Sequence, residues 1–256
     1  MAKIFCIANQ KGGVGKTTTT VNLAAGLARI GQRVLLVDLD PQGNATMGSG
    51  VDKRKLDMTV YDVLLEAASI VDARVRSEKC GYDVLGANRE LAGAEIELVA
   101  LERREMRLKQ ALAKVDKEYD FILMDCPPSL SMLTLNGLCA ANGVVVPMQC
   151  EYFALEGLTD LVNTIKQVHA NLNKDLKVIG LLRVMFDPRI TLQQQVSEQL
   201  KEHFGEKVFN TVIPRNVRLA EAPSYGLPGV IFDPSSKGAR AFEAFAKEMV
   251  ERIVKA

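Results

Sequence analysis

The sequence lacks an excess of either charge sign, with 32 Lys and Arg residues against 31 Asp and Glu residues and a net charge of +1. A chain so close to neutral has no overall field that attracts nucleic acid or a membrane surface, so any basic binding face has to be local. No apolar run approaches the ~18 residues that a membrane-spanning helix needs. No signal region precedes the first apolar stretch, and we therefore expect a soluble, cytoplasmic protein.

The sequence also has few residues that could form disulfides or metal sites. Its five cysteines form neither a CxxC pair nor a close cluster with a histidine: Cys6, Cys80, Cys126, Cys139 and Cys150. An odd number of thiols without a secretory signal indicates a reducing compartment. We therefore expect most of the cysteines to be small buried apolar residues, and we assign no ligand role to His169 or His203.

What the sequence does have is a regular alternation of apolar runs and amphipathic stretches. Apolar runs typical of buried strands occur at 3–8, 34–38, 82–86, 120–124, 143–147, 178–182 and 208–213. Helical spacing occurs at 16–30, 60–65, 102–117, 131–140, 155–172, 192–204 and 239–254. This alternation predicts the α/β class, with a doubly wound, mostly parallel sheet that has helices on both faces. Because no repeat or linker-like composition interrupts it, we expect a single domain over 1–256.

The stretch KGGVGKTT, from Lys11 to Thr18, separates the first predicted strand from the first predicted helix. Its glycines allow a tight turn that directs backbone N–H groups inward, and the start of a helix adds a positive dipole end, so the stretch is a cradle for phosphate. In such a loop Lys16 contacts the β- and γ-phosphates and the Thr17 hydroxyl ligates Mg²⁺. The usual pattern G-x-x-x-x-G-K-[ST] is not met, because Gln10 replaces its first glycine and an additional lysine follows.

Carboxylates end two further predicted strands. Asp38 and Asp40 lie in DLDPQGN after the second strand, and Asp125 lies in DCPPS after the fourth. Taken alone, each aspartate could merely cap the following turn. A carboxylate that ends a buried strand beside a phosphate loop is, however, the arrangement that holds Mg²⁺ directly or through water. Because Asp38 and Asp125 are expected to lie next to the glycine loop, we interpret both as metal-binding residues.

Together these motifs resemble the ParA/MinD superfamily of dimeric P-loop ATPases. KGGVGKT is similar to the deviant Walker A loop of that superfamily, DLDPQGN to its switch I, and FILMDCPPS to its Walker B and switch II segments. The segments IANQ, VIPRN and RLAEAPS fit the chromosomal, Soj-type ParA branch, and the resemblance extends from Asn9 to Lys237. It implies a P-loop NTPase fold of the deviant Walker A type, with slow, partner-stimulated hydrolysis of Mg-ATP in a homodimer that encloses two nucleotides.

The resemblance also implies roles for individual residues. Lys11 would be a signature lysine that reaches the phosphates of the partner subunit, Asp40 would orient the attacking water, and Thr17, Asp38 and Asp125 would surround Mg²⁺. Lys11, Lys16 and Asp40 would thus be catalytic. The expected nucleotide-binding residues are those of the loop together with three near the adenine: Lys11, Gly12, Gly13, Val14, Gly15, Lys16, Thr17, Thr18, Met185, Pro214 and Asn216.

Four basic residues in the last part of the sequence are expected to bind DNA: Arg215, Arg218, Lys237 and Arg240. Acidic residues are interspersed among them, so composition alone describes an ordinary solvated face. DNA binding is implied by the resemblance. Contacts to phosphates are independent of base sequence and sensitive to salt, which suits a protein that associates with the nucleoid. The implied function is chromosome or plasmid partitioning with a ParB-like, centromere-binding partner.

Three other functions stay open on the sequence alone. A MinD-like, membrane-cycling ATPase would have an amphipathic last helix, which this chain has. The polar face of that helix mixes Glu with Lys and Arg, however, so we expect it to pack on its own sheet and expect no membrane partner. The other two are an ATP-dependent ligase of the dethiobiotin-synthetase kind and a DNA-binding scaffold that holds ATP without hydrolysing it. Pro128 stands where the related nitrogenase iron proteins have a cluster-binding cysteine, so we expect no cluster.

Overall fold

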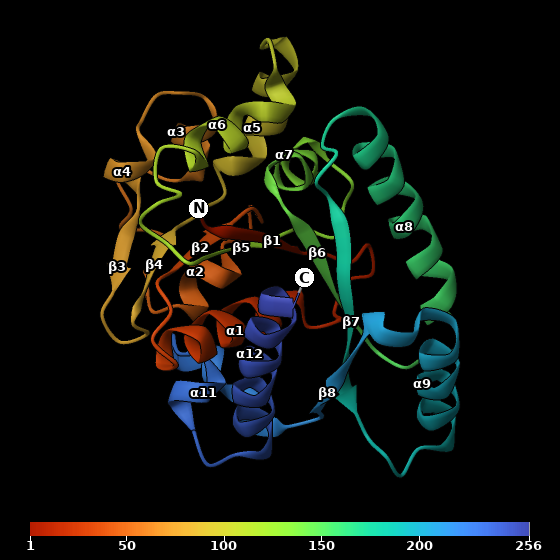
Figure 1. The fold of residues 1–256 in the computed structure, drawn as a ribbon. Coiled ribbons are helices and arrows are strands. Elements are labelled where there is room, and N and C mark those ends of the chain that lie inside the picture. Colours follow the sequence, from red (N-terminus) through yellow and green to blue (C-terminus); the bar gives the residue numbers. More distant parts are fainter. Residues whose placement is uncertain (256) are drawn as a thin grey trace.

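An eight-stranded sheet forms the centre of the molecule (Figure 1). The structure is a computed structural model that describes residues 1–255, apart from the side chains of Glu156 and Lys255. The strands, in sheet order, are β3 (Val75–Ser77), β4 (Tyr82–Leu85), β2 (Val34–Asp38), β5 (Phe121–Asp125), β1 (Lys3–Ile7), β6 (Gly143–Met148), β7 (Lys177–Phe186) and β8 (Val208–Pro214). Neighbouring strands are parallel except for β3, which is antiparallel to β4. The predicted doubly wound, mostly parallel sheet is therefore confirmed.

Helices cover both faces of this sheet (Figure 1). One layer contains α3 (Val60–Leu64), α4 (Ile70–Ala73), α5 (Leu91–Glu97), α6 (Arg107–Leu112), α7 (Met132–Ala140), α8 (Ala154–Asn171) and α9 (Thr191–Phe204). The other contains α1 (Lys16–Arg29), α2 (Asn44–Gly48), α10 (Val217–Glu221), α11 (Gly229–Phe232) and α12 (Lys237–Lys255). Successive strand side chains point to opposite faces. Thus Cys6 enters the first core, whereas Phe5 and Ile7 enter the second.

The last helix, α12, packs against the sheet and α1 as predicted. Its apolar stripe of Phe242, Phe245, Ala246 and Met249 is buried in the second core. The packing against α1 is close, because a Cβ placed on Gly26 would lie 3.0 Å from the Cβ of Ala246. Among residues 1–255, no helix combines the length and the apolar character that crossing a membrane requires.

The same helix covers the outer edge of β8. The Glu248 carboxylate accepts the backbone N–H groups of Asn210 at 2.7 Å and Thr211 at 2.8 Å. Arg252 donates to the Val208 carbonyl at 2.9 Å. These side chains occupy backbone groups that a further strand would otherwise use. The opposite edge of the sheet is the three-residue strand β3.

The predicted helix over 102–117 is wrong in its extent. A 3₁₀ turn, Arg104–Met106, precedes the short helix α6. Arg103 interrupts the segment with a left-handed φ of 50°, which an α-helix cannot accommodate. The Arg104 side chain hydrogen-bonds the carbonyl of Val99, and that of Arg107 the carbonyl of Glu102. Strand β3 and helix α5 were not predicted, because β3 is very short and α5 lacks a capping signal.

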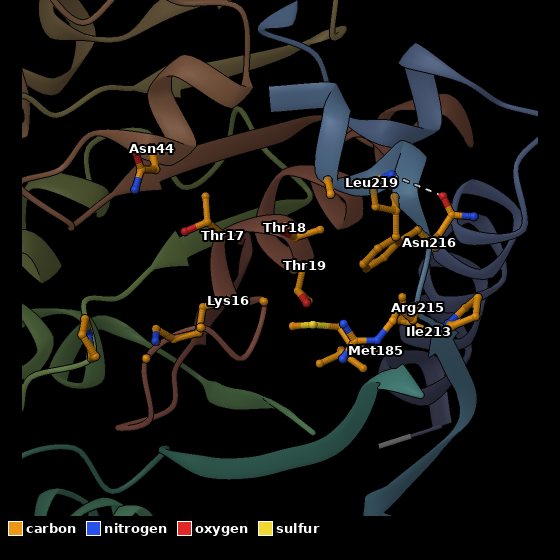
Figure 2. Close-up of a pocket in the computed structure, with 18 of the residues that line it drawn as sticks. Lys16, Thr17, Thr18, Thr19, Asn44, Met185, Ile213, Arg215, Asn216 and Leu219 are labelled. Atoms are coloured by element: carbon orange, nitrogen blue, oxygen red, sulfur yellow. Dashed lines mark hydrogen bonds between the residues drawn. The ribbon is translucent and has the colours of Figure 1, made fainter. Parts of the chain in front are cut away.

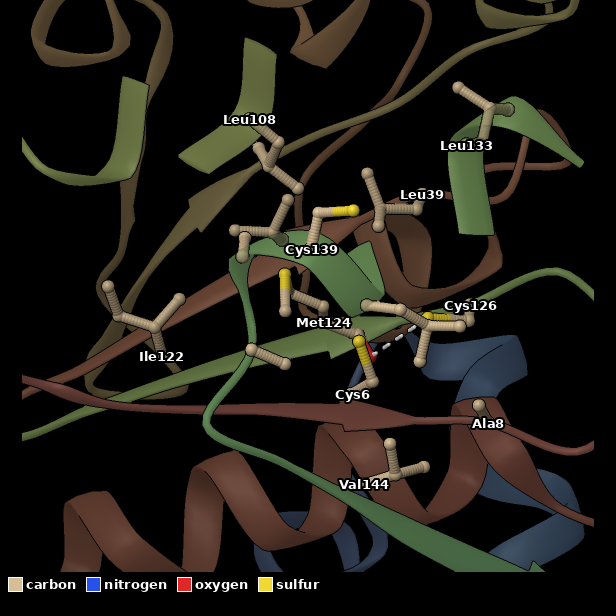
Figure 3. Close-up of a cluster of buried hydrophobic side chains, with 14 of the residues drawn as sticks. Cys6, Ala8, Leu39, Leu108, Ile122, Met124, Cys126, Leu133, Cys139 and Val144 are labelled. Atoms are coloured by element: carbon tan, nitrogen blue, oxygen red, sulfur yellow. Dashed lines mark hydrogen bonds between the residues drawn. The ribbon is translucent and has the colours of Figure 1, made fainter. Parts of the chain in front are cut away.

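Three of the five cysteines lie close together, with Cys139 on α7 and with Cys6 and Cys126 beneath that helix (Figure 3). All five are buried and free, which confirms the prediction for their thiols. Burial, reinforced by Cys126, raises the pKa of Cys6 well above its ordinary value. A thiol of this kind is poorly reactive because it is rarely ionised. Gly137 of α7 makes room for the cluster, since a Cβ at this position would lie 3.1 Å from the sulfur of Cys6 and 3.4 Å from that of Cys126.

We predict opposite effects for two glycine-to-alanine changes in helices. Gly137→Ala should destabilise the protein by about 1–3 kcal/mol, because the new methyl group overpacks the core beneath α7. Gly157→Ala, in α8, should stabilise it by about 0.5–1 kcal/mol, because no atom lies within 4 Å of the new Cβ and alanine favours the helix. Urea unfolding curves measure both changes. Equal effects of the two substitutions would contradict the packing described for α7.

Candidate nucleotide-binding site

The predicted site lies at the carboxyl ends of β1, β2 and β5, which are neighbours in the sheet. Ile7 on β1 pairs with Asp125 on β5, and Asp38 on β2 pairs with the same Asp125. The glycine loop that follows β1 therefore stands directly beside both strand-end carboxylates. Ligands of doubly wound sheets bind at this edge.

The glycine loop has the backbone of a phosphate cradle. Gly13 and Gly15 adopt left-handed φ values of 73° and 74°, which favour glycine. Gly15 directly precedes α1, so the unpaired N–H groups of the first helical turn face the cradle. Lys16 folds back across the loop, and its ammonium group donates to the Lys11 carbonyl at 3.1 Å. Burial lowers the pKa of Lys16 from its ordinary value, although Asp125 and Asp40 partly offset this.

Asp125 forms the acidic corner of the site. Its carboxylate accepts the hydroxyl of Thr17 at 2.7 Å and that of Thr20 at 3.0 Å. Burial and the neighbouring Asp38 raise the pKa of Asp125 above its ordinary value, because a buried carboxylate beside another charge of the same sign is poorly stabilised. A divalent cation at this corner would reverse the effect. The hydroxyl of Thr17 and the carboxylate of Asp125 are thus adjacent oxygen donors that suit Mg²⁺.

Asp38 is placed differently from Asp125. It is fully buried, and it accepts the N–H and hydroxyl of Thr46 at 2.8 Å and 2.7 Å and the N–H of Asp40 at 3.1 Å. Burial raises the pKa of Asp38 to about 6. Asp38 does not line the cavity described below, whereas Asp40 does. Asp125 does not line it either, although its partner Thr17 does. Asp38 holds α2 and Asp40 in place, and its role at a metal ion stays a prediction.

A cavity of about 520 Å³ opens in front of the loop, which is a usual size for a small-molecule site. Figure 2 shows Lys16, Thr17 and Asn44 on one side and Met185 and Ile213 on the other. The polar end is lined by Gly12, Gly13, Gly15, Lys16, Thr17, Thr18 and Asp40, and the far end by Val184, Met185, Ile213, Pro214, Asn216, Leu219 and Phe242. A charged cradle joined to an apolar pocket can hold a molecule with phosphates at one end and a flat base at the other.

Two of the predicted nucleotide-binding residues lie outside this cavity. Lys11 forms an ion pair with Glu151 on the surface, where its side chain is 49% exposed. Val14 is buried and borders a separate small recess beside Lys11. Lys11 therefore points away from the phosphate end of its own chain.

The basic residues that were expected to bind DNA fall into three settings. Arg215 lines the nucleotide cavity with Pro214, apart from the other three. Arg218, on α10, is paired with Glu221 at 2.9 Å and with Asp233 at 3.4 Å. Lys237 and Arg240 are exposed in the first turns of α12. Lys237 and Arg240 form no ion pair among the described residues, which distinguishes them from Arg218.

Some residues of the site were missed from the sequence. Asn44 and Pro128 line the cavity, and both belong to motifs that had already been singled out, so their position next to Asp40 and Asp125 could have identified them. Part of the apolar lining had the same signal, because Ile213 lies in VIPRN and Leu219 and Ala220 lie in RLAEAPS. Val184 and Phe242 had none, because they resemble ordinary core residues in sequence.

Gln149 was also missed, although it bridges the two ends of the site. It follows β6, and its side-chain amide lies 3.2 Å from the Gly13 carbonyl and 3.1 Å from the Met185 sulfur. Met185 has a left-handed φ of 51°, which is uncommon for a residue with a side chain. The amide of Gln149 thus connects the cradle to the wall of the apolar pocket.

Comparisons with known proteins agree with this geometry. The profile of a family described as an AAA domain matches residues 2–178. The sporulation initiation inhibitor protein Soj of Bacillus subtilis is 54% identical over 97% of this chain and 98% of its own. The chromosome partitioning protein ParA of Caulobacter vibrioides is 48% identical over 98% of this chain and 94% of its own. The chain belongs to the Soj/ParA family of chromosome-partitioning ATPases.

A solved structure is similar to this Soj/ParA chain over nearly its whole length. It is that of cobyrinic acid a,c-diamide synthase from Mycobacterium smegmatis with bound ADP and magnesium, with a TM-score of 0.86 and 41% identity. The match covers 98% of this chain and 95% of that one.

The residues of this Soj/ParA chain fit Mg-ATP. No cluster of three or more carboxylate, imidazole or thiol groups able to hold a metal ion occurs in the described part of the chain. Mg²⁺ does not need one, since it is usually held by one or two protein groups together with phosphate oxygens and water. Thr17 and Asp125 supply such groups beside the cradle. The Thr19 hydroxyl, which lines the cavity, is buried without a partner among the described residues and could meet a ligand there.

We predict that Asp125→Asn stabilises the protein while it abolishes the response to Mg-ATP. The raised pKa means that the folded state binds the Asp125 proton more tightly than the unfolded chain does, so the contribution of Asp125 to stability falls as the pH rises from about 4 towards neutrality. Removing the charge should raise the free energy of unfolding. The melting temperature in EDTA at pH 7 should then rise by about 2–4 °C for each kcal/mol of that increase.

Differential scanning calorimetry with EDTA and then with Mg-ATP measures both effects. The control is Asp160→Asn, at an exposed position on α8. It should change neither the melting temperature in EDTA nor the shift that Mg-ATP causes. A large Mg-ATP shift retained by Asp125→Asn would contradict the metal-binding assignment.

Proposed function

We propose that this chain is a Mg-ATP-dependent dimerising switch that binds DNA without base specificity and partitions chromosomes or plasmids with a ParB-like partner. We also propose that it forms a single ATPase domain and is cytoplasmic and nucleoid-associated. The observation that carries the proposal is the cavity that joins the glycine cradle to an apolar base pocket in a member of the Soj/ParA family of ATPases. Thr17 in its lining donates to Asp125 behind it. ADP and magnesium in the Mycobacterium smegmatis relative support Mg-ATP as the ligand.

The residues of one chain would divide the chemistry among them. Lys16 neutralises charge on the β- and γ-phosphates, and Mg²⁺ held near Thr17 and Asp125 supplies Lewis-acid stabilisation of the phosphate oxygens. Asp40 lines the cavity, and its carboxylate accepts the Gln42 N–H at 2.9 Å, which fixes its orientation. Asp40 thus positions the attacking water.

The position of Lys11 supports a site that is completed by a second subunit. Its side chain is exposed, lies outside the cavity of its own chain and is held by Glu151. A cation brought from the partner subunit can stabilise charge that develops on the transferred phosphoryl group, in the way that an arginine finger does. Hydrolysis would then depend on dimerisation, and loss of the γ-phosphate would favour the monomer.

A second function is favoured by one observation, the name of the Mycobacterium smegmatis relative, a diamide synthase. An ATP-dependent ligase consumes ATP fastest when its small acid substrate is present. Phosphate release that rises with such an acid, and not with DNA and a ParB-like protein, would favour the ligase. The membrane-cycling alternative is weakened because the apolar face of α12 is buried against the rest of the chain.

We predict that Asp40→Ala binds ATP and dimerises but does not turn over. Phosphate release should fall by about a hundredfold or more, because the water is no longer oriented. Light scattering after size exclusion should show a dimer with ATP that persists. The matched control is Asp187→Ala, which removes a strand-end aspartate paired with Arg189 outside the cavity. A monomer in ATP would contradict the role given to Asp40.

The proposed DNA face is tested by the double variant Lys237→Gln/Arg240→Gln. If both residues contact phosphates, the slope of log affinity against log salt should become shallower by about two, and the affinity should fall for every sequence alike. Fluorescence anisotropy with ATP, with ADP and without nucleotide measures this. Lys166→Gln/Lys201→Gln changes the net charge equally on exposed positions of α8 and α9 and serves as the control. Equal losses in the two double variants would argue against a local DNA face.

A further inference from the structure

The short helix α10 belongs to two surfaces at once. Leu219 and Ala220 line the nucleotide cavity, whereas the side chain of Arg218 is 55% exposed and pairs with Glu221 and Asp233. The helix has five residues and is capped by Asn216, whose side chain accepts the Leu219 N–H at 3.3 Å. Figure 2 shows this cap at the edge of the cavity. A helix of one turn cannot shift one of its faces without moving the other.

The segment that begins with α10 is tied to α1 by one buried side chain. Asn22 is 1% exposed, its amide donates to the Thr18 carbonyl at 2.8 Å, and its oxygen accepts the Val230 N–H at 3.0 Å. Thr18 lines the phosphate end of the cavity, and Val230 lies in α11. Asn22 therefore joins the nucleotide cradle to the segment through two hydrogen bonds. α11 lies beside α1 and α12 in Figure 1.

The same segment touches α2 through bare backbone. Gly50 and Gly226 both have left-handed φ values, 75° and 63°. A Cβ on Gly50 would lie 3.1 Å from the Gly226 carbonyl, and a Cβ on Gly226 would lie 3.3 Å from the Met47 carbonyl. α2 starts at Asn44, which lines the cavity close to Asp40. A rearrangement of this switch I region would therefore be passed to Gly226 by direct contact.

We propose that residues 216–232 are a coupling segment, held by Asn22 on α1 and by Gly226 against α2, that makes affinity for duplex DNA depend on the bound nucleotide. This inference rests on the proposed function. Two ligands are coupled only when both distinguish the same two arrangements of the protein. α10 meets that condition, because the nucleotide would contact Leu219 and the same side chain lies against Gly238 in the first turn of α12. Asn22 and Gly226 are positioning residues that touch neither ligand.

Two variants each perturb one link, and each has a matched control. Asn22→Ala deletes both hydrogen bonds of the buried amide. Asn171→Ala deletes a bond of the same type, from the side chain to the carbonyl four residues earlier, on an exposed turn of α8. Gly226→Ala forces a Cβ against α2, whereas Gly31→Ala places a Cβ in open space at a similar left-handed φ of 85°.

The readout is the ratio of the affinities for a fluorescein-labelled duplex of random sequence with Mg-ATP and with Mg-ADP, measured by anisotropy. Asn22→Ala and Gly226→Ala should lower this ratio by about fivefold or more, while fluorescent ATP still binds and the controls keep the ratio. A merely structural role would weaken DNA binding in both nucleotide states and leave the ratio unchanged. That result would overturn the proposal. If Asn22→Ala does not fold, Gly226→Ala, on a half-buried loop, decides.

Wild-type protein separates the two levels of inference. Equal DNA affinity with ATP and ADP in the wild type would overturn both the proposed function and the coupling segment. The other case is a wild-type ratio of DNA affinities, with Mg-ATP over Mg-ADP, that is well above 1. If both variants keep that ratio, only the coupling segment is overturned.

Discussion

Two carboxylates buried side by side at the ends of β2 and β5 constrain everything around them. Asp38 and Asp125 are paired in register and buried, and burial raises the pKa of both carboxyls. The charge of Asp38 raises the pKa of Asp125 further. Hydroxyl groups donate hydrogen bonds to both carboxylates: that of Thr46 to Asp38, and those of Thr17 and Thr20 to Asp125. Thr17 and Thr20 lie on α1 and Thr46 on α2, so the two helices that border the phosphate cradle are fastened to the sheet by the same pair of acids.

This arrangement explains why the acids have different uses. Asp38 accepts three donors from Thr46 and Asp40, so it holds α2 and Asp40 in place. Asp125 has two hydroxyl partners, one of which also faces the cavity, so a cation can compete for it. Stability and ligand binding are therefore in opposition at Asp125, because the charge that is costly in the empty protein is the charge that a magnesium ion needs.

Much of the fold and of the phosphate end could be predicted from the sequence because the signals there are local. Each of these signals is contained in a few consecutive residues. They are the apolar runs of β1, β2 and β5, the glycines of the loop and the acids at the strand ends. The apolar end could not be predicted in full, because Val184, Leu219 and Phe242 come from separate elements and become a pocket only when the sheet brings them together. The helix predicted over 102–117 was wrong for a different reason. Arg103 interrupts the helical pattern with a left-handed backbone angle that composition does not reveal.

The covered edge of β8 bears on how copies of this chain can meet. Glu248 and Arg252 occupy the N–H groups of Asn210 and Thr211 and the carbonyl of Val208 in β8, and the other end of the sheet is a strand of three residues. Sheets with open edges can join strand to strand into assemblies that are slow to come apart. A strand that paired with β8 here would have to displace Glu248 and Arg252 from its backbone.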